Sequence, residues 1–110
     1  MTHRNDVTNM PADPRHRAWL QNDARKQLSF FAQSLQQDGR FCALNWDGSP
    51  KDDTSQELHS TSRMVHSFAL GKAFGHDGAD QIIDAGMAAL WDWHRDIAHG
   101  GYCWQVDGTR

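Results

Sequence analysis

Apolar residues recur at intervals of three and four along three stretches of the chain, and this spacing predicts helices rather than strands. The predicted helices span residues 14–37, beginning at residue 14 or 15, then residues 54–74, beginning at residue 54 or 55, and then residues 78–93. We expect Leu90 and Trp91 in the core, where truncating either would cost about 2–5 kcal/mol. The sequence therefore predicts an all-α fold. The three apolar stripes are Leu20, Ala24, Leu28, Phe31 and Leu35; Leu58, Val65, Phe68 and Ala69; and Ile82, Ile83, Met87, Leu90 and Trp91.

Capping signals mark the ends of these helices. Asp13 precedes Pro14, which suits a capped first turn. Thr54 and Glu57 have the spacing of a capping box and predict the start of the second helix. The link "GHDG" at residues 75–78 is short, so the second and third helices are expected to form an antiparallel hairpin.

Two similar segments follow helices. "GRFCALNWDGSP" begins at Gly39 and "GGYCWQVDGTR" begins at Gly100. Each predicts a short strand, at residues 41–46 and 102–106, followed by an Asp-Gly turn. The likeness is either a weak internal repeat or a coincidence. Because the second turn is the last feature of the sequence, we expect the chain to be the first part of something longer, or a fragment of it.

Composition excludes several classes of function. The chain has 110 residues, the size of one small domain, and a net charge of −3, which does not favour nucleic-acid binding. No apolar run approaches the roughly 20 residues of a membrane span. Residues 1–13 are polar, lack the apolar region of a secretory signal and predict a flexible arm. We therefore expect a cytoplasmic protein that binds neither nucleic acid nor membrane.

Cysteine and histidine do not predict a disulfide framework or a metal site. Cys42 and Cys103 are far apart in the sequence and are expected to be free thiols in a reducing compartment. The seven histidines are scattered, and no HxxxH or HExxH pair occurs among them. No metal and no cofactor is expected.

The stretch "HSTSRMVH" holds two histidines and an arginine within eight residues, more ionisable side chains than a packed helix usually has. At helical spacing His59, Arg63 and His66 form one polar patch, apart from the apolar stripe. Periodicity alone favours an ordinary solvated face. The small hydroxyl residues around Arg63 favour a pocket wall instead, and arginine suits ligands rich in oxygen. Both interpretations remain open at this point.

The runs "STSRMVHSFALGKAFG" and "GMAALWDWHRDIAHGGYCWQVD" resemble the N-acylglucosamine 2-epimerase superfamily. The likeness is nearest to its D-mannose isomerase and aldose–ketose isomerase members, and it extends from Trp19 to the end of the chain. It implies an (α/α)6 barrel with a sugar site at one end of the inner helix ring. Residues 14–110 would then form part of such a barrel, with the second helix in the inner ring.

The resemblance also implies a reaction and a set of site residues. The reaction is interconversion of mannose and fructose through a cis-enediol; the alternative within the superfamily is a 2-epimerase acting on N-acylglucosamine or cellobiose. Arg63 would be the catalytic residue, binding the sugar and stabilising the enediolate. His59 would line the substrate, and Tyr102 and Trp104 would wall a monosaccharide.

The general bases of this superfamily come from later helices and are expected beyond Arg110. We therefore expect the chain alone to be inactive, and the particular sugar and the oligomeric state stay open. His66 is either a neighbour that supports Arg63 or a packed core histidine. A further alternative is a non-catalytic helical module that binds a partner helix. The histidines that do not match the superfamily's catalytic positions are His66, His76, His94 and His99.

Overall fold

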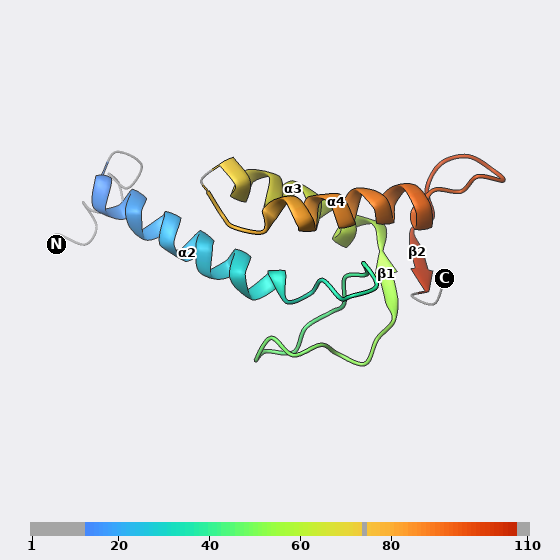
Figure 1. Ribbon diagram of the computed structural model, residues 1–110, viewed down its shortest axis with the longest axis horizontal. Coiled ribbons are helices and arrows are strands. Elements are labelled where there is room, and N and C mark those ends of the chain that lie inside the picture. Colours follow the sequence, from blue (N-terminus) through green and yellow to red (C-terminus); the bar gives the residue numbers. More distant parts are fainter. Residues whose placement is uncertain (1–12, 74, 108–110) are drawn as a thin grey trace, which may run out of the picture.

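The described part of the chain, residues 13–73 and 75–107, is mostly helical in the computed structural model. The helices are α2 (Pro14–Ala32), α3 (Leu58–Ala73) and α4 (Ala79–Ala89), and α4 continues into a π-helical turn, η2 (Leu90–His94). Two short strands, β1 (Ser55–Glu57) and β2 (Gln105–Asp107), form a small sheet (Figure 1). The mostly helical character predicted from the sequence is confirmed. Apart from Asp13, the predicted flexible arm lies outside the described residues.

Helix α2 begins as predicted but ends earlier than Gln37. Asp13 caps it, because its carboxylate accepts a hydrogen bond from the Arg15 amide at 2.9 Å. Past Ala32 the chain turns to bond with the following segment. The Ser34 carbonyl accepts from the Cys42 amide at 2.9 Å, and the Ser34 hydroxyl donates to the Cys42 carbonyl at 2.6 Å. These two bonds draw Ser34 out of the helical path.

The strand predicted at residues 41–46 is wrong. This segment makes only isolated bridges, Leu35 with Phe41 and Leu44 with Pro50. Its backbone–backbone hydrogen bonds join it only to residues nearby in the sequence, so no extended ladder forms. The turn predicted at residues 47–48 is present, with the Gly48 amide donating to the Asn45 carbonyl at 2.9 Å. Gly48 has φ of +89°, a left-handed conformation that favours glycine.

The capping box predicted at residues 54–57 is also wrong. Residues 55–57 form β1, which pairs antiparallel with β2 so that Gln56 lies opposite Val106. The Thr54 hydroxyl donates to the Asp107 carboxylate at 2.8 Å instead of capping a helix. Helix α3 therefore starts at Leu58, whose amide donates to the Trp104 carbonyl at 2.7 Å.

The second predicted strand, at residues 102–106, is shifted toward the C-terminus. Regular pairing covers only β2, while Tyr102 forms an isolated bridge with Arg95. Asp107 belongs to β2 rather than to a turn, and Gly108 lies outside the described residues. The strand is displaced because its hydrogen-bonding partner is β1.

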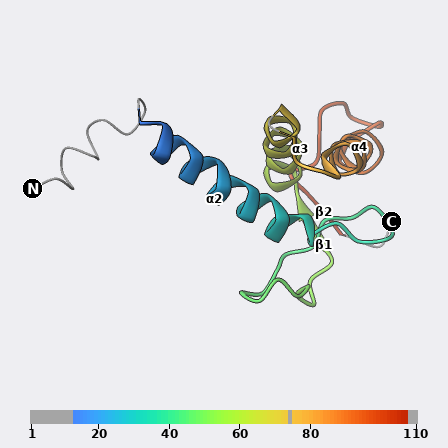
Figure 2. The ribbon, with the colours of Figure 1, turned by 60° about the vertical axis from the view of Figure 1, so that its left-hand side comes forward.

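The predicted hairpin of the second and third helices is confirmed, with α3 and α4 lying side by side (Figures 1 and 2). The His76 amide donates to the Gly71 carbonyl at 3.0 Å, and Gly75 takes φ of +84° to end α3. A Cβ atom on Gly86 would collide with Val65, so this glycine permits the close approach of the two helices.

A small core joins α3 and α4 to the end of α2. Its buried members come mainly from the predicted stripes, and Phe68 is almost completely enclosed. The prediction of Trp91 as a core residue is wrong, because Trp91 is 57% exposed and the Arg95 guanidinium lies 3.7 Å from its ring centroid. Leu90 is only partly buried. The core cluster comprises Leu28, Phe41, Phe68, Ala79 and Ile82.

The arrangement is elongated, because α2 projects away from the α3–α4 pair (Figure 2). The radius of gyration is 17.2 Å, against about 13 Å for a compact domain of this length. Leu20 and Phe31 of the predicted α2 stripe are consequently exposed, as is Met87 on α4. Among the described residues, no helix combines the length and apolarity needed to cross a membrane.

Candidate functional site

A groove of about 950 Å³ lies between α3, the end of α2 and the segment that joins α2 to α3. Apolar side chains from the core reach its surface, and polar side chains from α3 and β1 stand beside them. A cavity of this size and mixed lining is typical of small-molecule sites. The lining residues used below are Phe41, Trp46, Gln56, Glu57, Ser60, Arg63 and Ser67.

Arg63 lines this groove from the second turn of α3. Its side chain is exposed, and among the described residues it makes no ion pair or side-chain hydrogen bond. A guanidinium is charged at all ordinary pH values and offers five donors in a fixed plane. Ser60 and Ser67 flank it on the same helix and also line the groove. Arg63 thus lies in a groove wall, and its role in binding or catalysis stays a prediction.

His66 lies away from the groove. It is exposed on α3 and is not one of the groove-lining residues. The expectation of a packed core histidine is therefore wrong for His66. Its exposure is that of a solvated helix face, so the polar patch divides into a groove-lining part around Arg63 and a solvated part around His66.

His59 and Trp104 are in direct contact. Their rings stack, with centroids 5.0 Å apart and an angle of 24° between the planes. The Nδ1 atom of His59 is buried and lies 3.7 Å from a carboxylate oxygen of Glu57. Pairing of β1 with β2 brings Trp104 beside the first turn of α3, because Glu57 lies opposite Gln105. Two of the four predicted site residues therefore meet, although neither is among the groove-lining residues, which include their neighbour Glu57.

Tyr102 and Trp104 do not form the shared wall that the sequence predicted. Tyr102 lies in the bridge with Arg95, and Trp104 immediately precedes β2. Both rings are about half exposed, and neither lines the groove. The structure brings Trp104 to His59 but places neither aromatic residue with Arg63.

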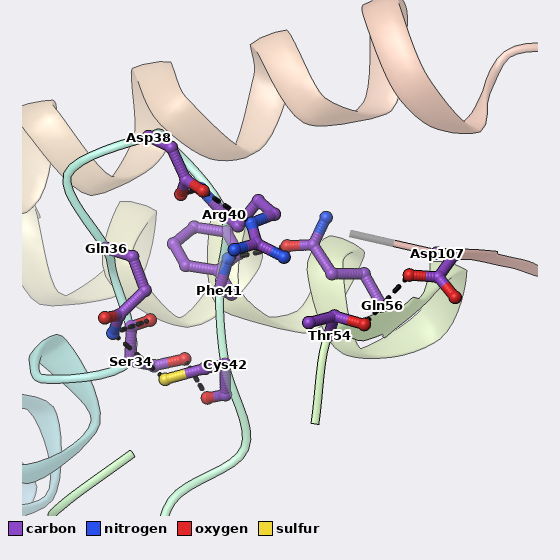
Figure 3. A network of polar contacts seen from close by, with 9 residues as sticks. All are labelled: Ser34, Gln36, Asp38, Arg40, Phe41, Cys42, Thr54, Gln56 and Asp107. Atoms are coloured by element: carbon purple, nitrogen blue, oxygen red, sulfur yellow. Dashed lines mark hydrogen bonds and ion pairs between the residues drawn. The ribbon is translucent and has the colours of Figure 1, made fainter. Parts of the chain in front are cut away.

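Gln56 is a groove residue that the sequence did not single out. It is 4% exposed, and its side-chain oxygen accepts a hydrogen bond from the Phe41 amide at 2.6 Å (Figure 3). Its Nε2 atom is buried and has no hydrogen-bond partner among the described residues. Assigning residues 54–57 to a helix start concealed this role. A short strand of three residues leaves almost no pattern by which Gln56 could have been found.

The same polar network ties the end of α2 to the groove (Figure 3). Gln36 donates from Nε2 to the Ser34 carbonyl at 3.1 Å and to the Cys42 sulfur at 3.0 Å. A hydrogen bond from the Arg40 amide, together with the Arg40 side chain at 2.6 Å, holds the pKa of the Asp38 carboxyl below its usual value. These contacts fix the chain on both sides of Phe41.

The two cysteines are free thiols in the described structure. Burial raises the pKa of the Cys42 thiol, so the thiol stays protonated near neutral pH. A protonated thiol is a poor nucleophile. Among the described residues, no group of three or more His, Cys, Asp or Glu side chains gathers to hold a metal ion.

Thr61 and His94 form a second buried polar contact, which joins α3 to η2. His94 is fully buried, its Nε2 atom lies 3.0 Å from the Thr61 hydroxyl, and its Nδ1 atom lies 3.2 Å from the Cys103 carbonyl. The pair links α3, η2 and the segment before β2. His94 therefore has a structural role, which helical periodicity could not reveal.

Carboxylates at the rim of the groove hold the connecting segment in place. Hydrogen bonds from the Ser49 hydroxyl and amide lower the pKa of Asp47. Hydrogen bonds from the Ser55 amide and hydroxyl likewise lower the pKa of Asp53. Both groups are therefore ionised near neutral pH and act as acceptors for the turns that they close.

Comparison with known proteins gives one consistent family. Residues 39–110 match the profile of the N-acylglucosamine 2-epimerase (GlcNAc 2-epimerase) family. The chain is 33% identical over 92 residues to a D-mannose isomerase of Thermobifida fusca, covering 84% of this chain and 23% of that protein. It is 32% identical over 89 residues to a D-mannose isomerase of Pseudomonas cannabina pv. alisalensis, covering 81% and 21%. The chain thus spans less than a quarter of the length of these relatives.

Proposed function

Because the chain belongs to the N-acylglucosamine 2-epimerase family of sugar isomerases and epimerases, we propose that it is part of an enzyme that interconverts mannose and fructose. The names of two relatives at about one-third identity support this substrate pair. The structural observation that carries the proposal is Arg63, a guanidinium that lines the groove and has no ion-pair partner among the described residues. Its natural ligand is a group of polarised oxygens.

The proposed reaction moves a proton between adjacent carbons of the open-chain sugar. A base removes the proton from C2 of the aldose, the C1 oxygen gains a proton, and a cis-enediol forms. Return of a proton to C1, with loss of the C2 hydroxyl proton, gives the ketose. Negative charge develops on the two oxygens during transfer, and Arg63 would stabilise it as a preorganised cation.

We propose that the bases belong to a longer protein in which this chain is one part. His59 would line the sugar beside Arg63, with its ring stacked on Trp104 and its Nδ1 atom 3.7 Å from a Glu57 carboxylate oxygen. His59 is not one of the groove-lining residues, but its neighbour Glu57 and Arg63 both are, which supports placing the sugar between them. Trp104 and Tyr102 would contact the part of the substrate that extends beyond the groove. One face of the Trp104 ring is covered by His59, so Trp104 would make this contact with its other face.

We also propose that residues 14–110 form part of an (α/α)6 barrel with α3 in the inner ring. The antiparallel packing of α3 on α4 supports this arrangement, and so do the large apolar side chains exposed on α2 and α4. Further helices of a barrel would cover those side chains. The exposed residues in question are Leu20, Phe31, Met87 and Trp91.

A second candidate is 2-epimerisation of an N-acylglucosamine or of cellobiose. The name of the matched family profile favours it. In that reaction the proton returns to the same carbon on the opposite face, so the same guanidinium would stabilise the same kind of intermediate.

The deciding experiment is a product assay on the protein expressed from its complete gene. Mannose, N-acetylglucosamine and cellobiose are each incubated in D₂O and followed by proton NMR. Formation of fructose carrying deuterium at C1 is the expected result. Epimerisation of one of the other two sugars without conversion of mannose would establish the second candidate. No reaction with any of them would overturn both.

A further inference from the structure

Among the large apolar side chains that the structure describes, Trp46 is the most exposed, with a relative exposure of 101%, and it nevertheless lines the groove. It lies within a tight turn of residues 45–49, in the segment that joins α2 to α3. An indole left wholly in water is unfavourable unless the surface is used for contact. Its position at the groove rim indicates that the contact is with whatever the groove binds.

The turn that carries Trp46 is closed by its own hydrogen bonds. The Asn45 amide donates to the Ser49 carbonyl at 2.8 Å, and the Gly48 amide donates to the Asn45 carbonyl at 2.9 Å. The Asp47 carboxylate accepts from the Ser49 hydroxyl at 2.6 Å and from its amide at 2.9 Å. These bonds span both sides of Trp46, so its backbone position is defined.

The turn is also anchored to the rest of the molecule. Gly48 is buried against the Gln33 side chain, and a Cβ atom at residue 48 would collide with it. Gln33 itself donates to the Phe30 carbonyl at 3.1 Å at the end of α2. At the base of the turn the Lys51 amide donates to the Ala43 carbonyl at 2.8 Å. Trp46 is therefore presented from a fixed support.

The groove beside Trp46 offers a complementary kind of group. Arg63 supplies planar donors, and Ser60 and Ser67 supply hydroxyls from α3. A pyranose ring has one face of C–H bonds, which suits an aromatic surface, and an edge of hydroxyl groups, which suits donors and acceptors. An exposed indole and a polar helix face lining one groove match that combination.

We propose that Trp46 is a substrate-positioning residue whose indole stacks on the C–H face of the closed sugar ring at the mouth of the groove. This inference rests on the proposed sugar isomerase function. It adds Trp46 to the residues that bind the sugar, and it adds binding of the closed ring as a step before ring opening. Ring opening breaks only the bond between C1 and the ring oxygen, so the C–H groups of C3 and C5 that face the indole would keep this contact through the later proton transfer. A contact of that kind changes KM and leaves kcat almost unaltered.

The test compares Trp46→Ala, Trp46→Phe and Trp19→Ala in the protein expressed from its complete gene. Trp46→Ala should raise KM for the sugar by about two- to tenfold, as expected for loss of one aromatic contact, with kcat nearly unchanged. Trp46→Phe should recover most of the affinity. Trp19 is 60% exposed on α2 outside the groove, so Trp19→Ala should match the wild type.

A binding measurement separates this inference from the proposed function. Mannose is titrated into wild type and Trp46→Phe while indole fluorescence is recorded, and the wild type should show a change that the variant lacks. Turnover of mannose with identical KM in wild type and both Trp46 variants, and with an identical fluorescence response in wild type and Trp46→Phe, would overturn the inference and leave the function intact. A fluorescence response that depends on Trp46, without turnover of mannose, would overturn the proposed function and retain Trp46 as a sugar-binding residue. Absence of both turnover and response would overturn the two together.

Discussion

The imidazole of His59 lies against the indole of Trp104, with 5.0 Å between the ring centroids. The contact depends on the sheet, because β1 runs directly into α3 and Trp104 directly precedes β2. Pairing of β1 with β2 therefore brings Trp104 to the first turn of α3. The Leu58 amide bonds to the Trp104 carbonyl at 2.7 Å, which fixes the first turn of α3 to this segment. Arg63 lies one turn beyond His59, so the sheet orients the groove-lining part of the helix.

The contact between His59 and Trp104 should be measurable as a coupling free energy. A double-mutant cycle of His59→Ala and Trp104→Ala, followed by urea unfolding, should give about 0.5–1.5 kcal/mol of favourable interaction. The corresponding cycle of His66→Ala with Trp104→Ala provides the control, because His66 is exposed and has no recorded contact with Trp104. Equal coupling in the two cycles would show that the stacking contributes nothing specific.

Arg63 should matter for activity far more than for stability. In the protein expressed from its complete gene, Arg63→Ala should lower kcat by about 10²–10³-fold, the usual effect of removing one group that stabilises developing negative charge. Because the side chain is exposed, the free energy of unfolding should change by less than about 0.5 kcal/mol. Arg63→Lys should restore little, since an ammonium lacks the planar fork of donors.

Lys26→Ala is the matched control for Arg63, because Lys26 is an exposed cation on α2 and does not line the groove. It should leave kcat unchanged. An Arg63→Ala protein that unfolds at ordinary temperature would instead assign Arg63 a structural role.

The Thr61 hydroxyl should stabilise the fold through His94. Thr61→Val keeps the shape of the side chain but leaves Nε2 of the fully buried His94 without its partner. The expected loss is about 1–3 kcal/mol in the free energy of unfolding, measured by urea denaturation. Ser62→Ala is the control, because Ser62 is exposed and its hydroxyl bonds only to the Leu58 carbonyl. A Thr61→Val protein as stable as the Ser62→Ala protein would contradict this role.

The segment that bears Trp46 should loosen in acid. The pKa values of Asp47 and Asp53 are lowered in the folded protein by their hydrogen bonds to serines. A carboxylate with a depressed folded-state pKa stabilises the fold above the ordinary aspartate value of about 3.9, and the contribution disappears as the pH falls through the folded-state value. Amide NMR signals of Ser49 and Ser55 should therefore remain constant near neutrality and shift below about pH 4.

Asp53→Asn should remove the acid transition at Ser55 and leave that at Ser49 in place. A Ser55 signal that shifts at the same pH in Asp53→Asn as in the wild type would contradict the assignment to Asp53.

The helices were predictable because their apolar spacing is a local property of the chain. Leu28, Phe68 and Ile82 lie in the core as their stripes required. Thr54 and Glu57 misled the assignment because a capping box is a local signal, whereas the partner of this segment is β2, far along the chain. Trp91 was misplaced for a related reason, since periodicity identifies an apolar face and not the element that covers it.

The site was predictable in part. The unusual hydroxyl-rich surroundings of Arg63 drew attention to the residue that now lines the groove. Tyr102 and Trp104 were assigned to one strand face because sequence alternation carries no information about where regular pairing starts. Gln56 and Trp46 were not identified from the sequence. Gln56 stands out because it is buried and Trp46 because it is exposed, and both properties depend on tertiary structure.

The bond between Thr54 and Asp107 joins residues 53 positions apart in the sequence. Closing so large a loop carries an entropic cost that must be met before the contact contributes anything, so such contacts tend to form late in folding. The α3–α4 hairpin, whose contacts are closer in sequence, is expected to assemble first. On a ribosome the start of α3 would therefore wait for the segment around residue 107 to emerge, and the groove would acquire its final outline only as β2 docks.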